Sequence, residues 1–387
     1  MDHARRLRHA ANKLQADMVD QLGTLVAYES APGSLPHLES CADLLAGWGE
    51  EVLGRRAQRV VLDGLPHLLW PAADQRVLLL GHFDTVFPVG TIRTRPFTVR
   101  GNLATGPGVC DMKAGIVQMF TALRLIEDTS TIGVLLTCDE ESGSVTSRPL
   151  IEREALRSGA VLVCEAATPE GHVKVARKGG SVYRLTVQGR AAHAGVEPQR
   201  GVNATVEVAH QVLALGALGA ADSGGTSVTP TLLSAGTTTN TVPESASLAV
   251  DVRAWTRAEL ERVDRAIRKL EPYLSEATLA VCGGINRYPM PAELARPLLE
   301  LAQSTARALG MPKLVGAYAA GASDGNFTAA LGVPTLDGLG AVGGGAHSAD
   351  EYVCLDRMPE RTALLAGLLA SVSSMEGFGA QAVSRIP

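Results

Sequence analysis

Several residues of this chain have metal-ligand side chains and stand in segments that would hold a ligand at a strand end or in a tight turn. They are two histidines and three acids: His82, Asp111, Glu141, Glu165 and His347. This set suits two divalent cations, because a carboxylate can bridge a pair of ions about 3.5–4 Å apart. Glu140 adjoins a ligand and would serve as the base. The residues therefore predict a hydrolytic two-metal centre.

The first segment is the H-x-D of His82 and Asp84, which follows an apolar run at 76–81. Side chains two residues apart on a strand share a face. Asp84 can then accept a hydrogen bond from the ring nitrogen of His82 that does not hold a metal. A histidine with a polar neighbour at a strand end is also common without a metal, so this motif alone does not decide.

Asp111 and Glu165 each have a structural alternative. Asp111 lies in a Gly/Pro turn, GPGVCDMKAG (106–115), that opens a helix. An isolated aspartate there is more often a helix N-cap than a metal bridge. Glu165 ends the strand VLVCE, where burying an unpaired carboxylate would cost several kcal/mol. It therefore needs a cation or hydrogen-bond donors.

Three adjacent acids at 139–141 end another apolar strand and run into a Ser-Gly-Ser turn. Acids at this density are either solvated loop charges or are held by cations. In the second case Glu141 binds metal, while Glu140 takes a proton from the attacking water and passes it to the leaving amine. His347 follows the glycines of VGGGA, which let the backbone approach closely, and it would be the last ligand.

The sequence pattern around these residues predicts an α/β domain. Continuous apolar runs at 76–81, 132–138 and 160–165 alternate with helical patterns such as 111–128. This order predicts a mostly parallel sheet with helices on both faces. Ligands bind outside the carboxyl ends of such strands, which is where the candidate residues of these segments fall.

From about Gly179 the pattern changes to alternating strands, which predicts an inserted α+β, ferredoxin-like domain at 179–290. Its expected strands are 181–189, 247–255 and 277–283, with helices at 203–215 and 257–274. The catalytic metal-binding domain then comprises 1–178 and 291–387. In its second part we expect a helix at 292–309, a strand near 333–337, a closing helix at 357–372, and Ser323 as the cap of a helix that lines the pocket.

Composition fits a globular protein of two domains: 387 residues, 46% hydrophobic and 19% charged. A net charge of −5 gives no reason to expect nucleic acid or an anionic membrane as partner. The N-terminal segment is basic and then amphipathic, without an apolar run fit for a signal peptide or membrane span. We expect a surface helix there rather than a transit peptide, and a cytoplasmic protein.

The cysteines show no CxxC pairing, which favours reduced thiols in the cytoplasm. Cys110, Cys138 and Cys164 stand directly before candidate acids or one residue further away, so thiolate ligation is an alternative. Alternation along a strand turns Cys110 and Cys164 to the core when their neighbours face the site. We therefore expect core packing.

The chain resembles the co-catalytic zinc aminoacylase and carboxypeptidase family. The matching stretches are GHFDTV (81–86), GPGVCDMKAG (106–115), TCDEESGS (137–144), CE (164–165), GRAAHAG (189–195) and GAHSADEYV (345–353). They span both expected domains. The family includes glutamate carboxypeptidases of the carboxypeptidase G type, aminoacylase, acetylornithine deacetylase and succinyl-diaminopimelate desuccinylase.

The resemblance implies a role for each candidate residue. One metal would be held by His82 and Glu165, and a second by Glu141 and His347. Asp111 would bridge them, followed by a cis peptide bond. Glu140 would be the general base, and Asp84 would support His82.

The resemblance also assigns residues of the inserted domain. His193, which the sequence alone places in a surface turn, would come from a partner subunit and stabilise the oxyanion, so the protein would be a homodimer whose small domain closes over the metals. Arg287, Asn240 and Arg253 would bind the substrate carboxylate end, since arginine holds carboxylates bidentately; for Arg253 a surface role is equally expected. The chain has Ala166 where a proline is common in the carboxypeptidase branch.

We expect a two-metal hydrolase that cleaves an amide bond next to a free carboxylate, acting like a glutamate carboxypeptidase on an N-acyl amino acid or short peptide. The alternative is an N-acyl amino acid deacylase of a biosynthetic or catabolic pathway. A catalytically silent binding protein on the same fold is a third interpretation, against which Glu140 and the full ligand set argue. Zinc is the expected ion, with cobalt and manganese as alternatives, because carboxylates and imidazoles accept all three.

Overall fold

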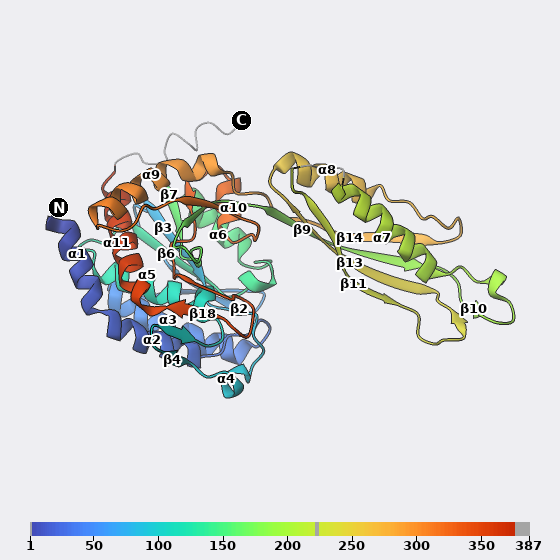
Figure 1. The fold of residues 1–387 in the computed structure, drawn as a ribbon, viewed down its shortest axis with the longest axis horizontal. Helices are drawn as coiled ribbons and strands as arrows, with labels where there is room; N and C mark the ends of the chain where they lie inside the picture. The colour runs from blue at the N-terminus through green and yellow to red at the C-terminus, as the bar shows by residue number, and fades with distance from the viewer. Residues whose placement is uncertain (1, 221–223, 376–387) are drawn as a thin grey trace. The chain divides into compact units, whose positions relative to one another are not determined.

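A computed structural model describes residues 2–220 and 224–375, which form two compact units (Figure 1). The larger unit is built from residues up to Ala176, from Met290–Ala319 and from Ser323 onward. The smaller unit is built from Arg177–Pro289 with Ala320–Ala322. Each unit has its own hydrophobic core, so we describe each by itself.

The larger unit is built on a six-stranded sheet in the order β1-β2-β6-β3-β7-β16. Its strands are β1 (Gln58–Leu62), β2 (Leu65–Trp70), β3 (Val77–His82), β6 (Ile132–Thr137), β7 (Ala160–Val163) and β16 (Thr335–Leu336). The strands β6, β3, β7 and β16 are parallel, while β2 and β1 continue the sheet antiparallel at one edge. The predicted mostly parallel sheet is confirmed.

Helices cover both faces of this sheet (Figure 1). The helices of this unit are α1 (Asp2–Lys13), α2 (Gln15–Ala27), α3 (Leu35–Leu53), α4 (Thr91–Thr94), α5 (Ala114–Arg124), α6 (Arg148–Leu156), α9 (Ala292–Ala308), α10 (Gly325–Ala330) and α11 (Met358–Ser374), of which α4 is a single turn without a buried residue. Alternate residues of β3 face opposite sides. Leu79 packs in the core with α5 and α11, whereas Leu78 and Leu80 pack in the core with α6 and α10.

A second, antiparallel sheet of the larger unit has the order β17-β18-β5-β4. Its strands are β4 (Thr98–Arg100), β5 (Leu103–Thr105), β17 (Gly343–Gly344) and β18 (Tyr352–Cys354), and a further pair joins β8 (Val173–Arg177) to β15 (Gly316–Ala319). These strands are two to five residues long, too short to show a period in the sequence. The pairing of Thr105 with Tyr352 sets the segment after β5 beside the segment before β18.

The smaller unit contains a four-stranded antiparallel sheet in the order β11-β13-β9-β14. Its elements are β9 (Gly179–Gln188), α7 (Ala204–Ala220), β11 (Ser227–Ala235), β13 (Ser245–Ala254), α8 (Arg257–Arg268) and β14 (Thr278–Arg287), with the short pair β10 (Ala192–His193) and β12 (Thr241–Val242). The predicted small α+β domain is confirmed. The position of β11 was not predicted, because it is a largely exposed edge strand interrupted at Pro230.

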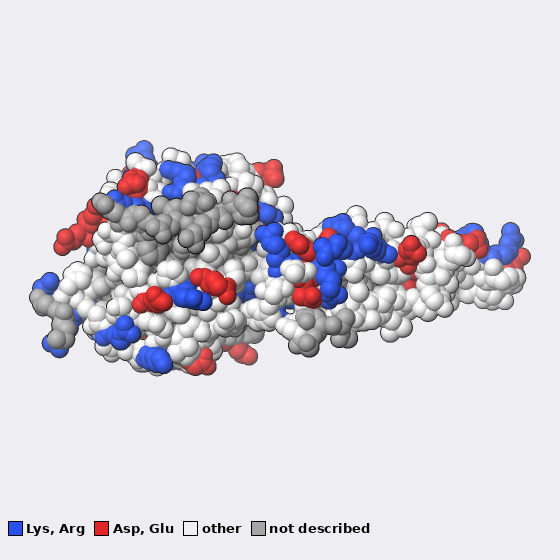
Figure 2. All heavy atoms as spheres, turned by 90° about the horizontal axis from the view of Figure 1, so that it is seen from above, with Lys and Arg blue, Asp and Glu red and all other residues white. Residues whose placement is uncertain are grey.

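The expected N-terminal helix is present as α1, which packs against α11 and buries Leu7 and Ala11. Among the described residues no helix combines the length and hydropathy needed to cross a bilayer. On the face shown in Figure 2, acidic and basic side chains are interspersed. The arginines of α8 are largely paired with acids on the same helix, for example Arg262 with Glu259 at 3.0 Å and Arg268 with Asp264 at 3.0 Å.

One helix begins differently from the prediction. The sequence predicts Ser323 as the cap of the helix after it, but α10 has Asp324 at its N-cap position. The Ser323 hydroxyl accepts a hydrogen bond from the Gly325 N–H at 3.2 Å and donates to Asp337 at 2.6 Å. Ser323 therefore ties the start of α10 to the segment after β16.

Candidate metal centre

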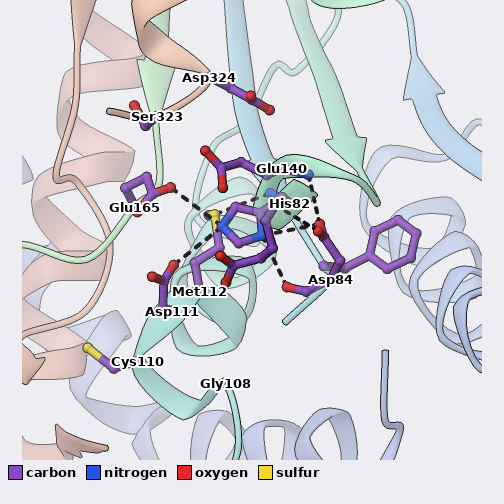
Figure 3. A network of polar contacts seen from close by, with 12 residues as sticks. His82, Asp84, Gly108, Cys110, Asp111, Met112, Glu140, Glu165, Ser323 and Asp324 are labelled. Carbon is purple, nitrogen blue, oxygen red and sulfur yellow. Dashed lines mark hydrogen bonds and ion pairs between the residues drawn. The ribbon is translucent and has the colours of Figure 1, made fainter. Parts of the chain in front are cut away.

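His82 is the last residue of β3, and its side chain is buried with only 2% exposed. Its Nδ1 lies 3.1 Å from the Asp84 backbone carbonyl and 3.4 Å from the Asp84 carboxylate. Its Nε2 faces the other way, 3.3 Å from Asp111 and 3.4 Å from Glu165 (Figure 3). The ring is thus oriented by Asp84 and presents Nε2 to two acids.

Asp111 lies in the turn between β5 and α5, and its two carboxylate oxygens face two different histidines. Oδ1 is 3.3 Å from His82 Nε2, and Oδ2 is 3.3 Å from His347 Nε2. Helix α5 begins at Ala114 and its N-cap position is Lys113, two residues after Asp111, which excludes the N-cap alternative. The Asp111–Met112 peptide bond is cis, as the resemblance implies.

The three acids after β6 have three different environments. Asp139 is buried, and its Oδ2 accepts hydrogen bonds from the Thr146 N–H and hydroxyl, both at 2.8 Å, so it shapes the loop. Glu141 reaches His347 at 3.2 Å. Glu140 donates its backbone N–H to Asp84, and Figure 3 shows its side chain directed away from Asp84 toward the side where Glu165 lies. Solvated loop charges do not describe this arrangement.

Glu165 and His347 complete the set from two separate loops. Glu165 follows β7, is 7% exposed, and accepts the Gly340 N–H at its backbone carbonyl. His347 has a φ of 66°, the left-handed region that non-glycine residues seldom adopt. Such backbone strain persists where the surrounding structure fixes it, and it clusters at functional sites.

Together these residues form two groups that share Asp111: His82, Asp111 and Glu165, and Asp111, Glu141 and His347. Within each group the ligand atoms lie within 4.8 Å of one another. The buried atoms His82 Nε2 and Asp111 Oδ1 make no hydrogen bond of good geometry. Buried polar atoms are normally satisfied, and imidazole nitrogen and carboxylate oxygen are both zinc ligands. The donors therefore fit two divalent cations with Asp111 between them.

The charges of these groups point the same way. Burial alone would lower the pKa of His82, but its contacts with Asp111, Asp84 and Glu165 raise that pKa well above the usual value. Hydrogen bonds to Asp111 and Glu141 raise the pKa of His347 to about 10. The pKa of Asp111 is lowered by both histidines although burial opposes this, and burial raises the pKa of Glu141. Both imidazoles thus have a raised pKa in the metal-free protein, and their protonated forms would supply the positive charge that the carboxylates require.

The cysteines beside the site lie outside both groups of potential ligands. Cys110, Cys138 and Cys164 are at most 2% exposed, and burial raises the pKa of each thiol. Neither group of potential ligands found among the described residues includes a cysteine. Their expected core packing is confirmed.

Sequence reasoning missed Glu351, a fully buried acid whose carboxylate accepts three backbone N–H groups of the Asp111 turn, from Gly108, Cys110 and Asp111, at 2.8–2.9 Å. It stands in HSADEYV after Asp350, which is exposed. Nothing in the sequence separates these two acids. Only the pairing of β18 with β5 turns Glu351 toward the turn.

The predicted residues of the smaller unit lie at two different ends of its sheet. Arg253 and Arg287 both stand opposite Gly180, near the start of β9. His193 and Asn240 lie beyond the other end, where the Ala194 N–H donates to the Asn240 carbonyl. Gln188 is eight positions along β9 from Gly180, which is roughly 26 Å at the rise of a strand.

Residues 78–371 of the chain match peptidase family M20/M25/M40. The chain belongs to this family. The match covers most of both units, and it confirms the family resemblance predicted from the motifs. As a member of peptidase family M20/M25/M40 with the ligand groups described above, the chain is a metallo-hydrolase.

Individual members of the M20/M25/M40 family match over most of their length. Carboxypeptidase G2 of Pseudomonas sp. (strain RS-16) is 30% identical, covering 95% of this chain and 92% of that protein. Succinyl-diaminopimelate desuccinylase of Variovorax paradoxus is 26% identical, covering 73% and 78%. The crystal structure of aminopeptidase PepT from Bacillus cereus has the same fold, with a TM-score of 0.71, 21% identity and coverage of 93% and 99%.

Proposed function

We propose that this metallo-hydrolase cleaves an amide bond next to a free carboxylate, in the manner of a glutamate carboxypeptidase, releasing a C-terminal amino acid from an acyl or peptidyl group. The observation that carries the proposal is the pair of ligand groups sharing Asp111, with Glu140 outside both of them. The 30% sequence identity with carboxypeptidase G2, over 95% of this chain, supports this substrate class.

In this proposal His82 and Glu165 would hold one divalent ion, Glu141 and His347 would hold the second, and Asp111 would be a ligand shared by both. The ions would supply Lewis acidity, lowering the pKa of water and polarising a carbonyl. Zinc is the proposed ion, since imidazole and carboxylate ligands suit it, and cobalt and manganese are alternatives.

The proton transfers fall to Glu140. Its carboxylate accepts a proton from the attacking water and then donates it to the leaving nitrogen, two steps for which one acid suffices. Its place is fixed through the backbone, because the N–H groups of Glu140 and Glu141 both donate to Asp84. Asp84 in turn orients His82, so the base and a ligand share one support.

His193 is built to donate a hydrogen bond to a developing oxyanion. Its Nδ1 accepts the N–H groups of Gly195 and Val196, both at 3.1 Å. In the neutral imidazole the proton must then be on Nε2, and the side chain is exposed. Donors preorganised in this way are effective in stabilising a tetrahedral intermediate.

We further propose a homodimer in which His193 and Asn240 act on the site of the partner subunit. Within the smaller unit, Arg287 pairs with Gly180 near the start of β9, whereas His193 lies beyond the other end of that strand. A small substrate cannot span the roughly 26 Å length of that strand. If both residues contact one substrate, they come from different chains.

For the substrate carboxylate Arg287 is the stronger candidate. Arg253 is engaged by Asp251 through both guanidinium and carboxylate atoms, at 2.8–3.2 Å. Arg287 is 8% exposed, and its Nη1 donates to the side chain of its own neighbour Asn286 at 3.1 Å. A carboxylate is the partner that a guanidinium fork binds best.

The second candidate function is an N-acyl amino acid deacylase, favoured by the match to succinyl-diaminopimelate desuccinylase. Both activities use the same hydrolytic steps and differ in which side of the amide is recognised. A silent binding protein is disfavoured, since it has no use for Glu140 beside an intact ligand set. The thiols buried without disulfides suit the cytoplasm, where we place the protein.

Hydrolysis of N-acyl-glutamates, N-succinyl and N-acetyl amino acids by the zinc-, cobalt- and manganese-loaded protein tests the proposal. Glu140→Gln should lower kcat by about 10²–10⁴-fold with the metal content unchanged. Glu170→Gln, at an exposed position, is the control. Equal turnover by the wild type and Glu140→Gln would refute the assigned base. If the rate of hydrolysis depends on which acyl group is present more than on a C-terminal glutamate, the deacylase is favoured.

A further inference from the structure

Glu351 is a buried acid beside the metal centre that neither ligand group contains. It is fully buried, yet its charge is met by backbone groups instead of a close cation. Oε1 accepts the N–H groups of Cys110 at 2.8 Å and Asp111 at 2.9 Å, and Oε2 accepts that of Gly108 at 2.9 Å. Backbone N–H groups of one turn that converge on an anion in this way form an anion-binding nest.

The nest belongs to the turn that carries Asp111, so Glu351 acts on the residue shared by both groups. The Asp111 N–H is itself one of the three donors. Its peptide plane is thereby fixed directly before the side chain that faces His82 and His347 at 3.3 Å each. A shift of this turn would change both distances together.

Glu351 also comes from the segment that carries His347. It lies four residues after that histidine and directly before β18, whose Tyr352 pairs with Thr105 of β5. A single side chain thus connects the His347 segment to the Asp111 turn. It thereby fixes the distance between His347 and Asp111, two potential ligands that are far apart in the sequence.

A carboxylate is needed for this contact in a way that an amide would not satisfy. Three donors are divided between two acceptor oxygens, whereas glutamine has one acceptor oxygen and an NH₂ group that would face an N–H. The negative charge of Glu351 is costly beside that of Asp111. The buried ammonium group of Lys113 has the opposite charge and interacts with Glu351. Cations bound by Asp111 would offset the remaining cost.

We propose that Glu351 is a positioning residue of the metal centre, which fixes the Asp111 carboxylate relative to His347 and thereby sets metal affinity. This inference rests on the proposed ligand assignment. It adds a residue that touches neither metal nor substrate and that acts through the backbone of the bridging ligand.

The test is titration of metal-free protein with Zn²⁺ against a chromophoric chelator, for the wild type, Glu351→Gln and two controls. Glu207→Gln is the structural control, because Glu207 is an equally buried glutamate that accepts the Tyr273 and Leu274 N–H groups in the smaller unit. Asp350→Asn is the charge control at the adjacent, exposed acid. Visible spectra of the Co²⁺-loaded proteins report ligand geometry, and the Tm of each metal-free protein reports the fold.

Glu351→Gln should raise the Kd for Zn²⁺ about 10- to 100-fold and alter the Co²⁺ spectrum. Glu207→Gln should lower the Tm by a similar amount with the Kd unchanged, and Asp350→Asn should change neither. If Glu351→Gln lowers only the Tm, or if Asp350→Asn weakens metal binding equally, Glu351 does not position the site. Should Glu351→Gln not fold, the same Kd, Co²⁺ spectrum and Tm are measured for Glu351→Asp, which keeps the charge on a shorter side chain, and the same outcomes decide. Failure of the wild type to bind Zn²⁺ would instead overturn the proposed function.

Discussion

Asp84 and Glu141 are joined by a hydrogen bond of 2.9 Å from the Glu141 N–H to the Asp84 carboxylate. The second oxygen of Asp84 accepts the Glu140 N–H at 3.3 Å, and the backbone carbonyl of Asp84 lies 3.1 Å from His82 Nδ1. The sequence predicted only the contact with the imidazole. The structure shows that the carboxylate chiefly holds the turn after β6, so one buried residue links the candidate base to ligands of both groups.

Asp84→Asn should therefore impair catalysis more than the loss of one imidazole contact would. Asparagine offers one acceptor oxygen, so either the Glu140 or the Glu141 N–H would face an NH₂ group. We expect kcat/KM to fall about 10- to 100-fold, with weaker metal binding. Steady-state kinetics and metal analysis check this, with Asp74→Asn at an exposed acid as control. Normal metal binding with normal kcat would show that Asp84 only fills space.

Metal binding should release protons and should tighten as the pH rises. The metal-free imidazoles carry protons because the surrounding carboxylates raise both pKa values, that of His347 to about 10. A metal needs the neutral ring and each ligand group has one histidine, so roughly one proton should leave for each ion bound at neutral pH, about two for the pair. Calorimetric titrations with Zn²⁺ in buffers of different ionisation enthalpy measure that number. Release of no protons would contradict protonated imidazoles in the metal-free protein.

The same shift gives the sign of the pH dependence of the metal-free fold. The folded protein binds the His347 proton more tightly than the unfolded chain, since its pKa is raised from 6.5 to about 10 by Asp111 and Glu141. The stabilisation is therefore complete below pH 6.5 and is lost as the pH rises toward 10. The Tm of metal-free wild type should fall over that window more than the Tm of His347→Gln. If the Tm of the two proteins falls equally with pH, the pKa of His347 is not raised in the folded protein.

The sequence was informative where the site is built from short, continuous segments. His82, Glu141 and Glu165 follow apolar strands whose parallel pairing is a local consequence of alternating strands and helices, so their meeting at one edge could be inferred. The Asp111 turn was recognisable from its glycines. The division into an α/β unit and an inserted α+β unit followed from the change in hydrophobic period.

What could not be predicted depends on contacts between distant segments. Glu351 reaches the Asp111 turn, 240 positions away in the sequence, because β18 pairs with β5, and each of these strands has only three residues. Asp139 stands directly before Glu140 and Glu141 in the sequence, yet it accepts hydrogen bonds from Thr146 and shapes the loop. Residue type and spacing are alike for acids with structural and chemical roles, and only tertiary pairing separates them.

Gly115 is required for the close approach of α5 to the end of β7. A Cβ at this position would lie 2.1 Å from the backbone oxygen of Cys164, next to Glu165. Gly115→Ala should therefore push the Asp111 turn away from Glu165, costing about 1–3 kcal/mol of stability and lowering metal content. Denaturant unfolding and metal analysis measure both effects.

Gly47 is the matched control, because it is also helical but a methyl group added there would have nothing within 4 Å. Gly47→Ala should stabilise the protein by up to about 1 kcal/mol, since alanine favours a helix over glycine. If Gly115→Ala behaves like Gly47→Ala, the approach of α5 to β7 does not position the site.

The proposed dimer predicts complementation between two inactive variants. A Glu140→Gln chain retains His193, and a His193→Ala chain retains Glu140. If His193 acts across the dimer, the heterodimer contains one complete site, formed by Glu140 of one chain and His193 of its partner. Random reassociation of equal amounts makes half of the dimers mixed, so mixing should restore roughly a quarter of wild-type activity. Activity measured after subunit exchange checks this, with gel filtration to confirm the dimer. No recovery in a mixture shown to contain heterodimers would mean that His193 acts within its own chain or takes no part, because both sites would then lack an essential group.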